Sequence, residues 1–314
     1  MAFEHNRRAL LKATGVGLTG ATAGCVSLLD GGGGSDEITV GGKEFTEQLI
    51  LSYISYHLLE DAGYNANDST GLGGNTSNHE AIVQGETDHY WEYTGTGLNY
   101  HLGYEDEKID DPDEQYERVA EAYEEEHDIA WLEMAPFNNT YVVTANEEWQ
   151  AETGIETISE LAEYINDGND VSWAVSNQYL ENPTALGDLP EFYEFEENVD
   201  EHVEWEEMSI GTINYQAVVE GETDLGLGFE TDPQLQQFDV ATIEDDRTWF
   251  VIYHPAPLVR EEVLEEHDDV EAVLSEPTEH LSTETVQHLN AEVAVEERDP
   301  SEVAREWLEN EGLL

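Results

Sequence analysis

The chain has 314 residues, of which 39% are apolar and 10% aromatic, enough to bury the core of one or two medium-sized domains. Its 73 acidic residues outnumber 10 basic ones, which gives a formal net charge of −63. This charge excludes nucleic acid as a partner, because phosphate binding needs basic patches. The acidic residues alternate with apolar ones, which predicts a folded protein from a halophile whose self-repulsion is screened by multimolar salt.

The N-terminal segment, residues 1–24, is typical of a twin-arginine lipoprotein signal peptide. An Arg-Arg pair precedes a mildly apolar stretch that is too short to span a bilayer. The stretch ends in Thr-Ala-Gly-Cys, which resembles a lipobox with Cys25 as the lipid-bearing residue. Residues 25–36 contain four consecutive glycines and predict a flexible tether. We therefore expect a domain anchored by lipid to the extracytoplasmic face of the cell membrane, without internal disulfides because Cys25 is the only cysteine.

Strand and helix patterns alternate along the rest of the chain. A strand is predicted at residues 37–41 and a helix with one apolar face at residues 46–62. The pair Asp299-Pro300 begins the last helix, because Asp can cap it and Pro suits its first turn. Further helices are predicted at residues 77–84, 113–126, 158–166, 215–220 and 283–290, and strands at 141–144, 171–175, 224–229 and 249–253. This alternation predicts an α/β fold with parallel or mixed sheets covered by helices.

One phrase occurs twice in the chain. Residues 80–88 read EAIVQGETD and residues 216–224 read QAVVEGETD. In each copy a helix ends at a glycine, a strand begins at the final Asp, and an aromatic residue, Tyr93 or Phe229, follows five positions later. Ligands bind at the carboxyl ends of strands in open α/β sheets. The repeat therefore predicts two similar lobes whose rings face one cleft.

The sequence contains no catalytic or metal-binding signature. Its 11 histidines are scattered without HExxH spacing, and neither a GxSxG elbow nor a phosphate-binding loop is present. We expect no enzymatic activity, no cofactor and no metal. Aromatic residues instead gather near loops, and rings at strand ends can form a box whose negative faces attract a quaternary ammonium, which has no N–H to donate. We assign Tyr253 to a crossover and not to this box.

The motifs KEFTEQ at residues 43–48 and EYTGT at residues 92–96, with matching stretches over most of residues 37–314, resemble the glycine betaine and choline binding subunits of ABC transporters for quaternary amines. The resemblance implies a two-lobed type II periplasmic-binding fold with mixed sheets and two interlobe crossovers. It implies capture of a quaternary ammonium osmolyte by lobe closure, and an ABC permease with its ATPase as partners. Lobe 1 would comprise residues 36–138 plus 234–314, and lobe 2 residues 139–233.

The resemblance also implies a set of ligand-binding residues. The cage rings would be Tyr93, Tyr141, Tyr215 and Phe229, with Lys43 and Thr96 at the carboxylate or hydroxyl end of the ligand and Asn139 beside the cage. Relatives that bind betaine often carry Tyr at the position of Phe229 and an Arg in the segment matching residues 178–190, which has no Arg here. Lys43 alone would then face a ligand carboxylate, so choline stays open beside glycine betaine.

Two alternative functions stay open. An amino-acid or polyamine binding protein would need an acidic residue at the cation and acceptors for its N–H groups. An extracellular enzyme built on the same lobes, such as a deaminase-like protein, would need a His or a carboxylate of perturbed pKa in the cleft.

Overall fold

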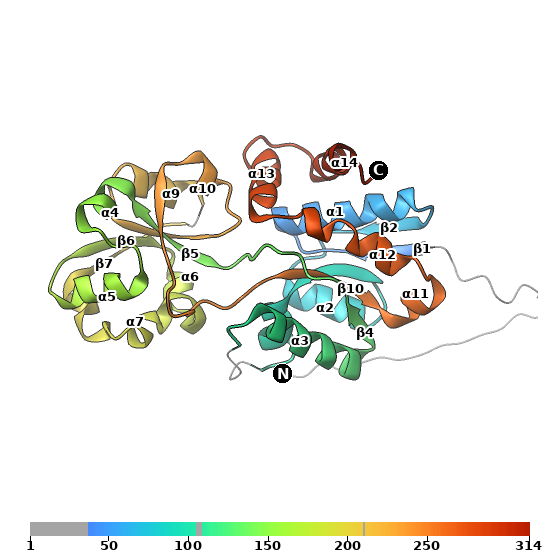
Figure 1. The fold of residues 1–314 in the computed structure, drawn as a ribbon, viewed down its shortest axis with the longest axis horizontal. Helices are drawn as coiled ribbons and strands as arrows, with labels where there is room; N and C mark the ends of the chain where they lie inside the picture. The colour runs from blue at the N-terminus through green and yellow to red at the C-terminus, as the bar shows by residue number, and fades with distance from the viewer. Residues whose placement is uncertain (1–36, 105–108, 210) are drawn as a thin grey trace, which may run out of the picture. The chain divides into compact units, whose positions relative to one another are not determined.

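The computed structural model describes residues 37–104, 109–209 and 211–314 (Figure 1). The expected signal peptide, the tether and the lipid-bearing Cys25 lie outside these residues. None of the helices described is both long and apolar enough to cross a membrane.

The first of two five-stranded sheets contains strands from both ends of the described chain. Its order is β2 (Asn65–Ser69), β1 (Glu37–Gly41), β3 (His89–Tyr93), β10 (Pro255–Arg260) and β4 (Ile129–Trp131). Strands β1, β2 and β3 are parallel, and β10 runs antiparallel to β3 and β4. The sheet is therefore mixed, and β10, which lies between β3 and β4, comes from more than a hundred residues later in the sequence than either of them.

The second sheet repeats this arrangement. Its order is β7 (Val203–Glu207), β6 (Val171–Val175), β8 (Leu225–Phe229), β5 (Tyr141–Asn146) and β9 (Val240–Ile243). Again three strands are parallel and one strand, β5, runs antiparallel between β8 and β9. The two mixed sheets with their helices confirm the predicted α/β class.

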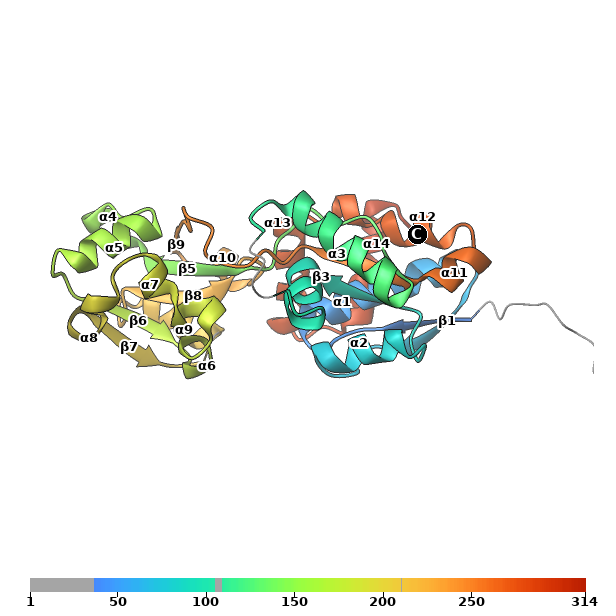
Figure 2. The same ribbon diagram turned by 90° about the horizontal axis from the view of Figure 1, so that it is seen from below.

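Helices cover both sheets (Figures 1 and 2). Those of the first sheet are α1 (Thr46–Asp61), α2 (Asn75–Val83), α3 (Pro112–His127), α11 (Glu261–Glu266), α12 (Val270–Ser275), α13 (Thr283–Ala294) and α14 (Pro300–Glu311). Those of the second are α4 (Glu147–Thr153), α5 (Ile158–Asn166), α6 (Asn177–Leu180), α7 (Leu189–Phe192), α8 (Val199–His202), α9 (Thr212–Val219) and α10 (Gln234–Gln237). We call the first sheet with its helices lobe 1 and the second lobe 2.

Strand β3 shows why the helices lie on both faces of the first sheet. Its side chains alternate, so that Trp91 packs in a buried cluster with residues of α1 and α14, while Tyr90 packs in another with residues of α3 and β4. All five residues of β3 are buried, although they include His89 and Glu92. A strand covered on both faces is nearly uniform in burial, which explains why its sequence lacks a strict alternation of apolar and polar residues.

The chain passes between the sheets twice, through residues 132–140 and 244–254. These two crossover segments are joined by hydrogen bonds, from Asn139 N to Tyr253 O at 3.0 Å and from Thr140 Oγ1 to Val251 O at 2.6 Å. The expected strand at 249–253 is therefore wrong, because its backbone pairs with the other crossover and not with a sheet. The expected lobe boundary at residue 233 also needs correction, since β9 still pairs with β5 in the second sheet.

The repeated phrase performs the same structural task in both lobes. Gly85 and Gly221 end their helices at φ of 71° and 69°. Asp88 Oδ2 accepts a hydrogen bond of 2.8 Å from Thr39 N in β1, and Asp224 Oδ2 accepts one of 2.8 Å from Ser172 N in β6. Each Asp thus ties the start of a central strand to the neighbouring parallel strand. This shared role accounts for the Gly and the Asp that both copies contain.

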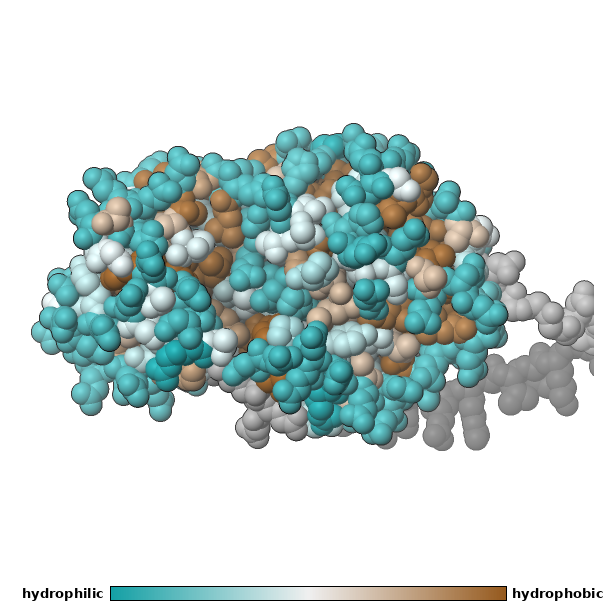
Figure 3. Space-filling view, viewed as in Figure 1, coloured by the Kyte–Doolittle hydropathy of each residue, from teal (hydrophilic) through white to brown (hydrophobic). Residues whose placement is uncertain are grey.

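The surface agrees with the composition. Hydrophilic residues cover most of the face drawn in Figure 3, with smaller apolar groups between them. Hydrophilic residues thus form the solvent-exposed surface around a packed interior, as the interleaved pattern of the sequence predicts.

Candidate functional site

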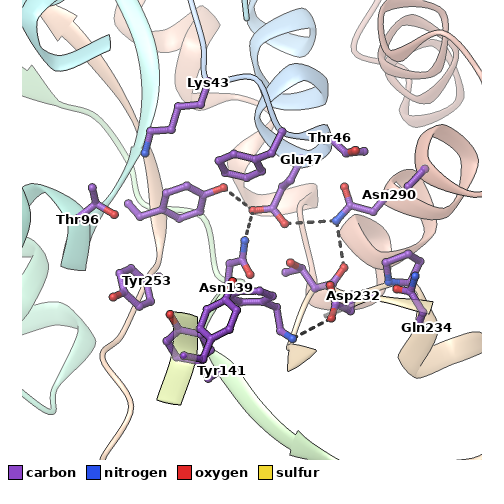
Figure 4. Close-up of a pocket in the computed structure, with 18 of the residues that line it drawn as sticks. Lys43, Thr46, Glu47, Thr96, Asn139, Tyr141, Asp232, Gln234, Tyr253 and Asn290 are labelled. Atoms are coloured by element: carbon purple, nitrogen blue, oxygen red, sulfur yellow. Dashed lines mark hydrogen bonds between the residues drawn. The ribbon is translucent and has the colours of Figure 1, made fainter. Parts of the chain in front are cut away.

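A cavity of about 560 Å³ is lined by residues of both lobes and of the two crossovers. The loop between β1 and α1 and the end of β3 contribute from lobe 1. The facing ends of β5 and β8 and the loop after β8 contribute from lobe 2 (Figure 4). Six of the residues expected from the sequence line this cavity: Lys43, Tyr93, Thr96, Asn139, Tyr141 and Phe229.

Three rings form the lobe 2 wall of the cavity. Tyr141 begins β5 directly opposite Phe229, the last residue of β8, and their ring centroids are 5.0 Å apart. Tyr179 of α6 meets both rings edge-on, at 5.6 Å from Tyr141 and 6.2 Å from Phe229. We call Tyr141, Tyr179 and Phe229 the lobe 2 ring group.

Two further rings form the lobe 1 wall. Phe45 stacks on Tyr93, with ring centroids 6.2 Å apart and planes inclined by 22°. Tyr253 lies in the second crossover, as expected, and it also lines the cavity. The crossover can approach this wall because Gly95 has no side chain: a Cβ there would lie 2.4 Å from Ile252 O.

Glu47 places a carboxyl group beside the lobe 1 rings. It lies in the first turn of α1, where a negative charge is favourable, yet it is buried. Its Oε1 accepts hydrogen bonds from Tyr93 Oη at 2.6 Å and from Asn139 Nδ2 at 3.0 Å. Burial raises the pKa of Glu47, and these neutral donors offset only part of that rise.

Lys43 borders the cavity, but its charge is already paired. The residue is 1% exposed, and its Nζ donates to Glu92 Oε1. Glu92 also accepts from Tyr90 Oη at 3.1 Å and contacts His101 Nε2 at 3.1 Å. Burial alone would raise the pKa of Glu92, but the Lys43 charge and the contact with His101 lower it to about 2. This pairing counts against the role expected of Lys43, the charge partner of a ligand carboxylate.

Tyr215 does not line the cavity, which corrects its expected place in the cage. It is 0% exposed and packs beneath Gly228, where a Cβ would lie 2.0 Å from its hydroxyl oxygen. Its Oη donates at 3.0 Å to Asp232 Oδ2, which also accepts from Phe229 N at 2.9 Å. Asp232 does line the cavity, and burial raises its pKa. Tyr215 therefore supports the loop after β8 from below.

Sequence reasoning missed the carboxyl groups and two of the rings. Glu47 lies within the KEFTEQ motif and Phe45 beside it, so proximity to Lys43 was an available signal. Tyr179 lies in residues 178–190, the segment that the family resemblance associates with the ligand, so its ring was also an available signal. No sequence pattern marks Asp232 or Asn290 as a site residue. Asp232 is one of many acidic residues, and Asn290 reaches the cavity from α13, far along the sequence from most of the other lining residues.

The arrangement can surround a compact cation with ring faces and neighbouring carboxyl groups. Among the described residues, no group of three or more His, Cys, Asp or Glu side chains is arranged to hold a metal ion. The neutral hydroxyl and amide groups of Thr96, Asn139 and Tyr253 can meet a polar end of the ligand. Such a site is suited to binding an organic cation.

Comparisons with known proteins agree with this geometry. A sequence model of the family described as the substrate binding domain of ABC-type glycine betaine transport system matches residues 36–310. A glycine-betaine-binding protein of Pseudomonas aeruginosa is 33% identical over 288 residues, covering 89% of each chain. The chemotactic signal transduction system substrate-binding protein CosB of Halobacterium salinarum is 34% identical, covering 82% of this chain and 79% of its own.

A solved structure shares the fold. The ligand-free YehZ structure from Escherichia coli superposes with a TM-score of 0.74 at 28% identity, covering 88% of this chain and 99% of its own. The two mixed sheets described above are thus those of a type II periplasmic-binding protein, as the sequence predicts.

Proposed function

Because the chain belongs to the family of substrate binding domains of ABC-type glycine betaine transport systems, we propose that its cavity holds the ammonium group of a quaternary amine between the rings of both lobes. As a member, it is an extracytoplasmic substrate-binding protein of an ABC importer for quaternary amines. The observation that carries the proposal is that the lobe 2 ring group lines one cavity together with Tyr93 and Tyr253.

The rings supply the binding energy for the cation. Each ring face contributes about 0.5–2 kcal/mol, so five desolvated rings account for about micromolar affinity. Rings also suit concentrated salt, since sodium and potassium ions compete with a ligand for carboxylates more than for aromatic faces. The proposed cage comprises Tyr93, Tyr141, Tyr179, Phe229 and Tyr253, with Thr96 and Asn139 at the polar end of the ligand.

Ligand capture would proceed by closure of the lobes around the cation. Support comes from hydrogen bonds that already join them: Asn290 Nδ2 of α13 donates at 3.0 Å to Thr231 O, and Gln287 Nε2 donates at 2.6 Å to Glu230 O. Such contacts between the lobes favour the closed state of a hinge, and a ligand that contacts both lobes favours it further. The crossovers at Asn139 and Tyr253 are the proposed hinge.

The N-terminal pattern supports a further part of the proposal. The protein is exported by the twin-arginine route and anchored through a lipid on Cys25, and its acidic surface is adapted to concentrated salt. It delivers its ligand to an ABC permease driven by an ATPase. Replacement of Cys25 by Ser tests the anchor: the protein should move from the membrane fraction to the medium, and retention on the membrane would contradict the anchor.

Similarity to CosB favours a second candidate, in which the same ligand complex docks on a chemotaxis receptor. Closure presents the same ligand-dependent surface to either partner. Deletion of the gene separates the two, since loss of uptake supports the importer and loss of attraction with normal uptake supports the receptor.

Titration of the purified protein in multimolar KCl tests the binding function. Tryptophan fluorescence would follow additions of choline, glycine betaine, carnitine, arginine and putrescine. Arginine and putrescine belong in the panel because Glu47 and Asp232 provide the acidic residues that an amino-acid or polyamine binder needs. We expect saturable binding of at least one quaternary amine and none of arginine or putrescine. Binding of the latter two alone would overturn the proposal.

A further inference from the structure

Acidic residues outnumber basic ones among the residues that line the cavity. Lys43, Glu47 and Asp232 are its ionisable residues besides the tyrosines. Lys43 is neutralised by Glu92, which lies behind the cavity wall. Neither Glu47 nor Asp232 has a Lys, Arg or His partner among the ion pairs of residues 37–104, 109–209 and 211–314. The cavity therefore carries two carboxyl groups without a matching cation.

The donors around Glu47 are all neutral. Besides Tyr93 and Asn139, Asn290 Nδ2 approaches Glu47 Oε2 at 3.4 Å. Hydrogen bonds from neutral groups lower the cost of burying a carboxylate but do not cancel its charge. A cation in the cavity would cancel it, so the site gains most from a ligand that brings a full positive charge.

The amide groups beside Glu47 already donate to protein acceptors. Because the Nδ2 groups of Asn139 and Asn290 face acceptors, on Glu47 and on the Thr231 carbonyl, their Oδ1 atoms point elsewhere. Both Oδ1 atoms are buried and have no hydrogen-bond partner within the described part of the chain. Because both Oδ1 atoms are buried, neither is open to a ligand. The N–H groups that Asn139 and Asn290 spend on Glu47 and Thr231 leave fewer donors for a ligand carboxylate, which only accepts.

Hydroxyl groups of Thr96 and Tyr253 remain as donors, so the cavity has groups that can solvate a ligand carboxylate. What disfavours a ligand carboxylate in this cavity is electrostatic repulsion. In a water-poor cavity, the carboxylate of a zwitterion is repelled by Glu47 and Asp232 and finds no unpaired cation among the described lining residues.

From this balance we infer that the cavity selects quaternary ammonium ligands of net positive charge, amino alcohols such as choline, over zwitterions such as glycine betaine, and that Glu47 sets this preference. The inference rests on the proposed function and names the ligand class of the same site.

The test compares choline with glycine betaine on three forms of the intact protein: wild type, Glu47→Gln and Glu44→Gln. Glu44 is exposed, does not line the cavity and lies in the loop just before α1, so its replacement removes the same charge three residues away. We expect wild type to bind choline at least about tenfold more tightly than betaine. Glu47→Gln should lose about tenfold in choline affinity and little in betaine affinity, while Glu44→Gln changes neither.

Three results are decisive. Tighter binding of betaine than of choline by wild type overturns the inference, and so does an equal loss for both ligands in Glu47→Gln. Failure of folded wild type to bind any quaternary amine would instead overturn the proposed function.

A second measurement needs no variant and so does not depend on folding of Glu47→Gln. Because a bound cation favours the ionised carboxyl, calorimetry over a series of pH values, each in two buffers of different ionisation enthalpy, should detect proton release with choline. Betaine should release less. Equal release with both ligands would also overturn the inference.

Discussion

Tyr93 Oη donates a hydrogen bond of 2.6 Å to Glu47 Oε1, so one wall of the cavity joins a ring face to a carboxyl group. Donation to an anion polarises the phenol and makes its ring face more attractive to a cation. The end of β3 and the first turn of α1 thus meet in this wall, where Lys43 Nζ also lies 4.9 Å from the centroid of the Tyr93 ring.

Removal of this hydrogen bond should make ligand binding more sensitive to acid. In Tyr93→Phe the ring stays, but Glu47 loses a donor that favours its ionised form, so its pKa, already raised by burial, should rise further. A cation binds the ionised form better, so affinity falls as pH falls through that pKa. Choline titrations over a pH series should place the loss at a higher pH in Tyr93→Phe than in wild type. Coincident curves would contradict the coupling.

The lobe 2 ring group should act through its ring faces. Tyr141→Ala removes the central ring and should weaken choline binding about tenfold or more, whereas Tyr141→Phe keeps the ring and should stay within about threefold. Fluorescence titration measures both. If Tyr141→Phe binds choline as weakly as Tyr141→Ala, the hydroxyl group and not the ring face of Tyr141 carries the interaction.

The buried pair of Lys43 and Glu92 should support the fold. Glu92→Gln leaves the Lys43 ammonium buried without its partner, which should cost about 3–5 kcal/mol of unfolding free energy. Lys43→Met added to Glu92→Gln should recover part of this loss. Denaturant unfolding measures wild type, Glu92→Gln, the double variant and Glu44→Gln. A loss in Glu92→Gln no greater than that in Glu44→Gln would contradict the assignment.

The same pair predicts how stability depends on pH. The pKa of Glu92 falls from 4.5 to about 2 on folding, so its contribution is present above pH 4.5 and is lost as pH falls toward 2. Unfolding at constant KCl concentration should therefore show wild type losing stability across that window, in excess of the loss seen in the double variant. Equal losses would assign acid sensitivity to other carboxyl groups.

The repeat made much of the fold predictable. Asp88 and Asp224 tie equivalent strands together in the two lobes, so both copies of the phrase mark the start of a central strand. Counting five residues from each Asp then locates Tyr93 and Phe229 at the ends of β3 and β8. The predicted strands at 37–41 and 171–175 and the helix at 158–166 agree with the structure to the residue. These elements are defined by local patterns and caps, such as the Thr157 capping box.

The rest of the site depends on contacts that sequence spacing does not encode. Glu47 was one acid among 73, and only its burial beside Tyr93 distinguishes it. Tyr215 matched a family motif, but α9 directs its ring under Gly228. The boundary at 233 failed because β9 is a short, partly exposed edge strand that lacks a strong periodic signal.

The central claim is that the cavity binds a positive charge. Calorimetric titration of the purified protein in multimolar KCl with choline and with 3,3-dimethylbutan-1-ol tests it most directly, because the two molecules share their shape and hydroxyl group and differ in charge. We predict that the neutral alcohol binds about a hundredfold more weakly than choline, or not measurably. Equal affinity for both would contradict the claim and leave the cavity as a purely apolar site.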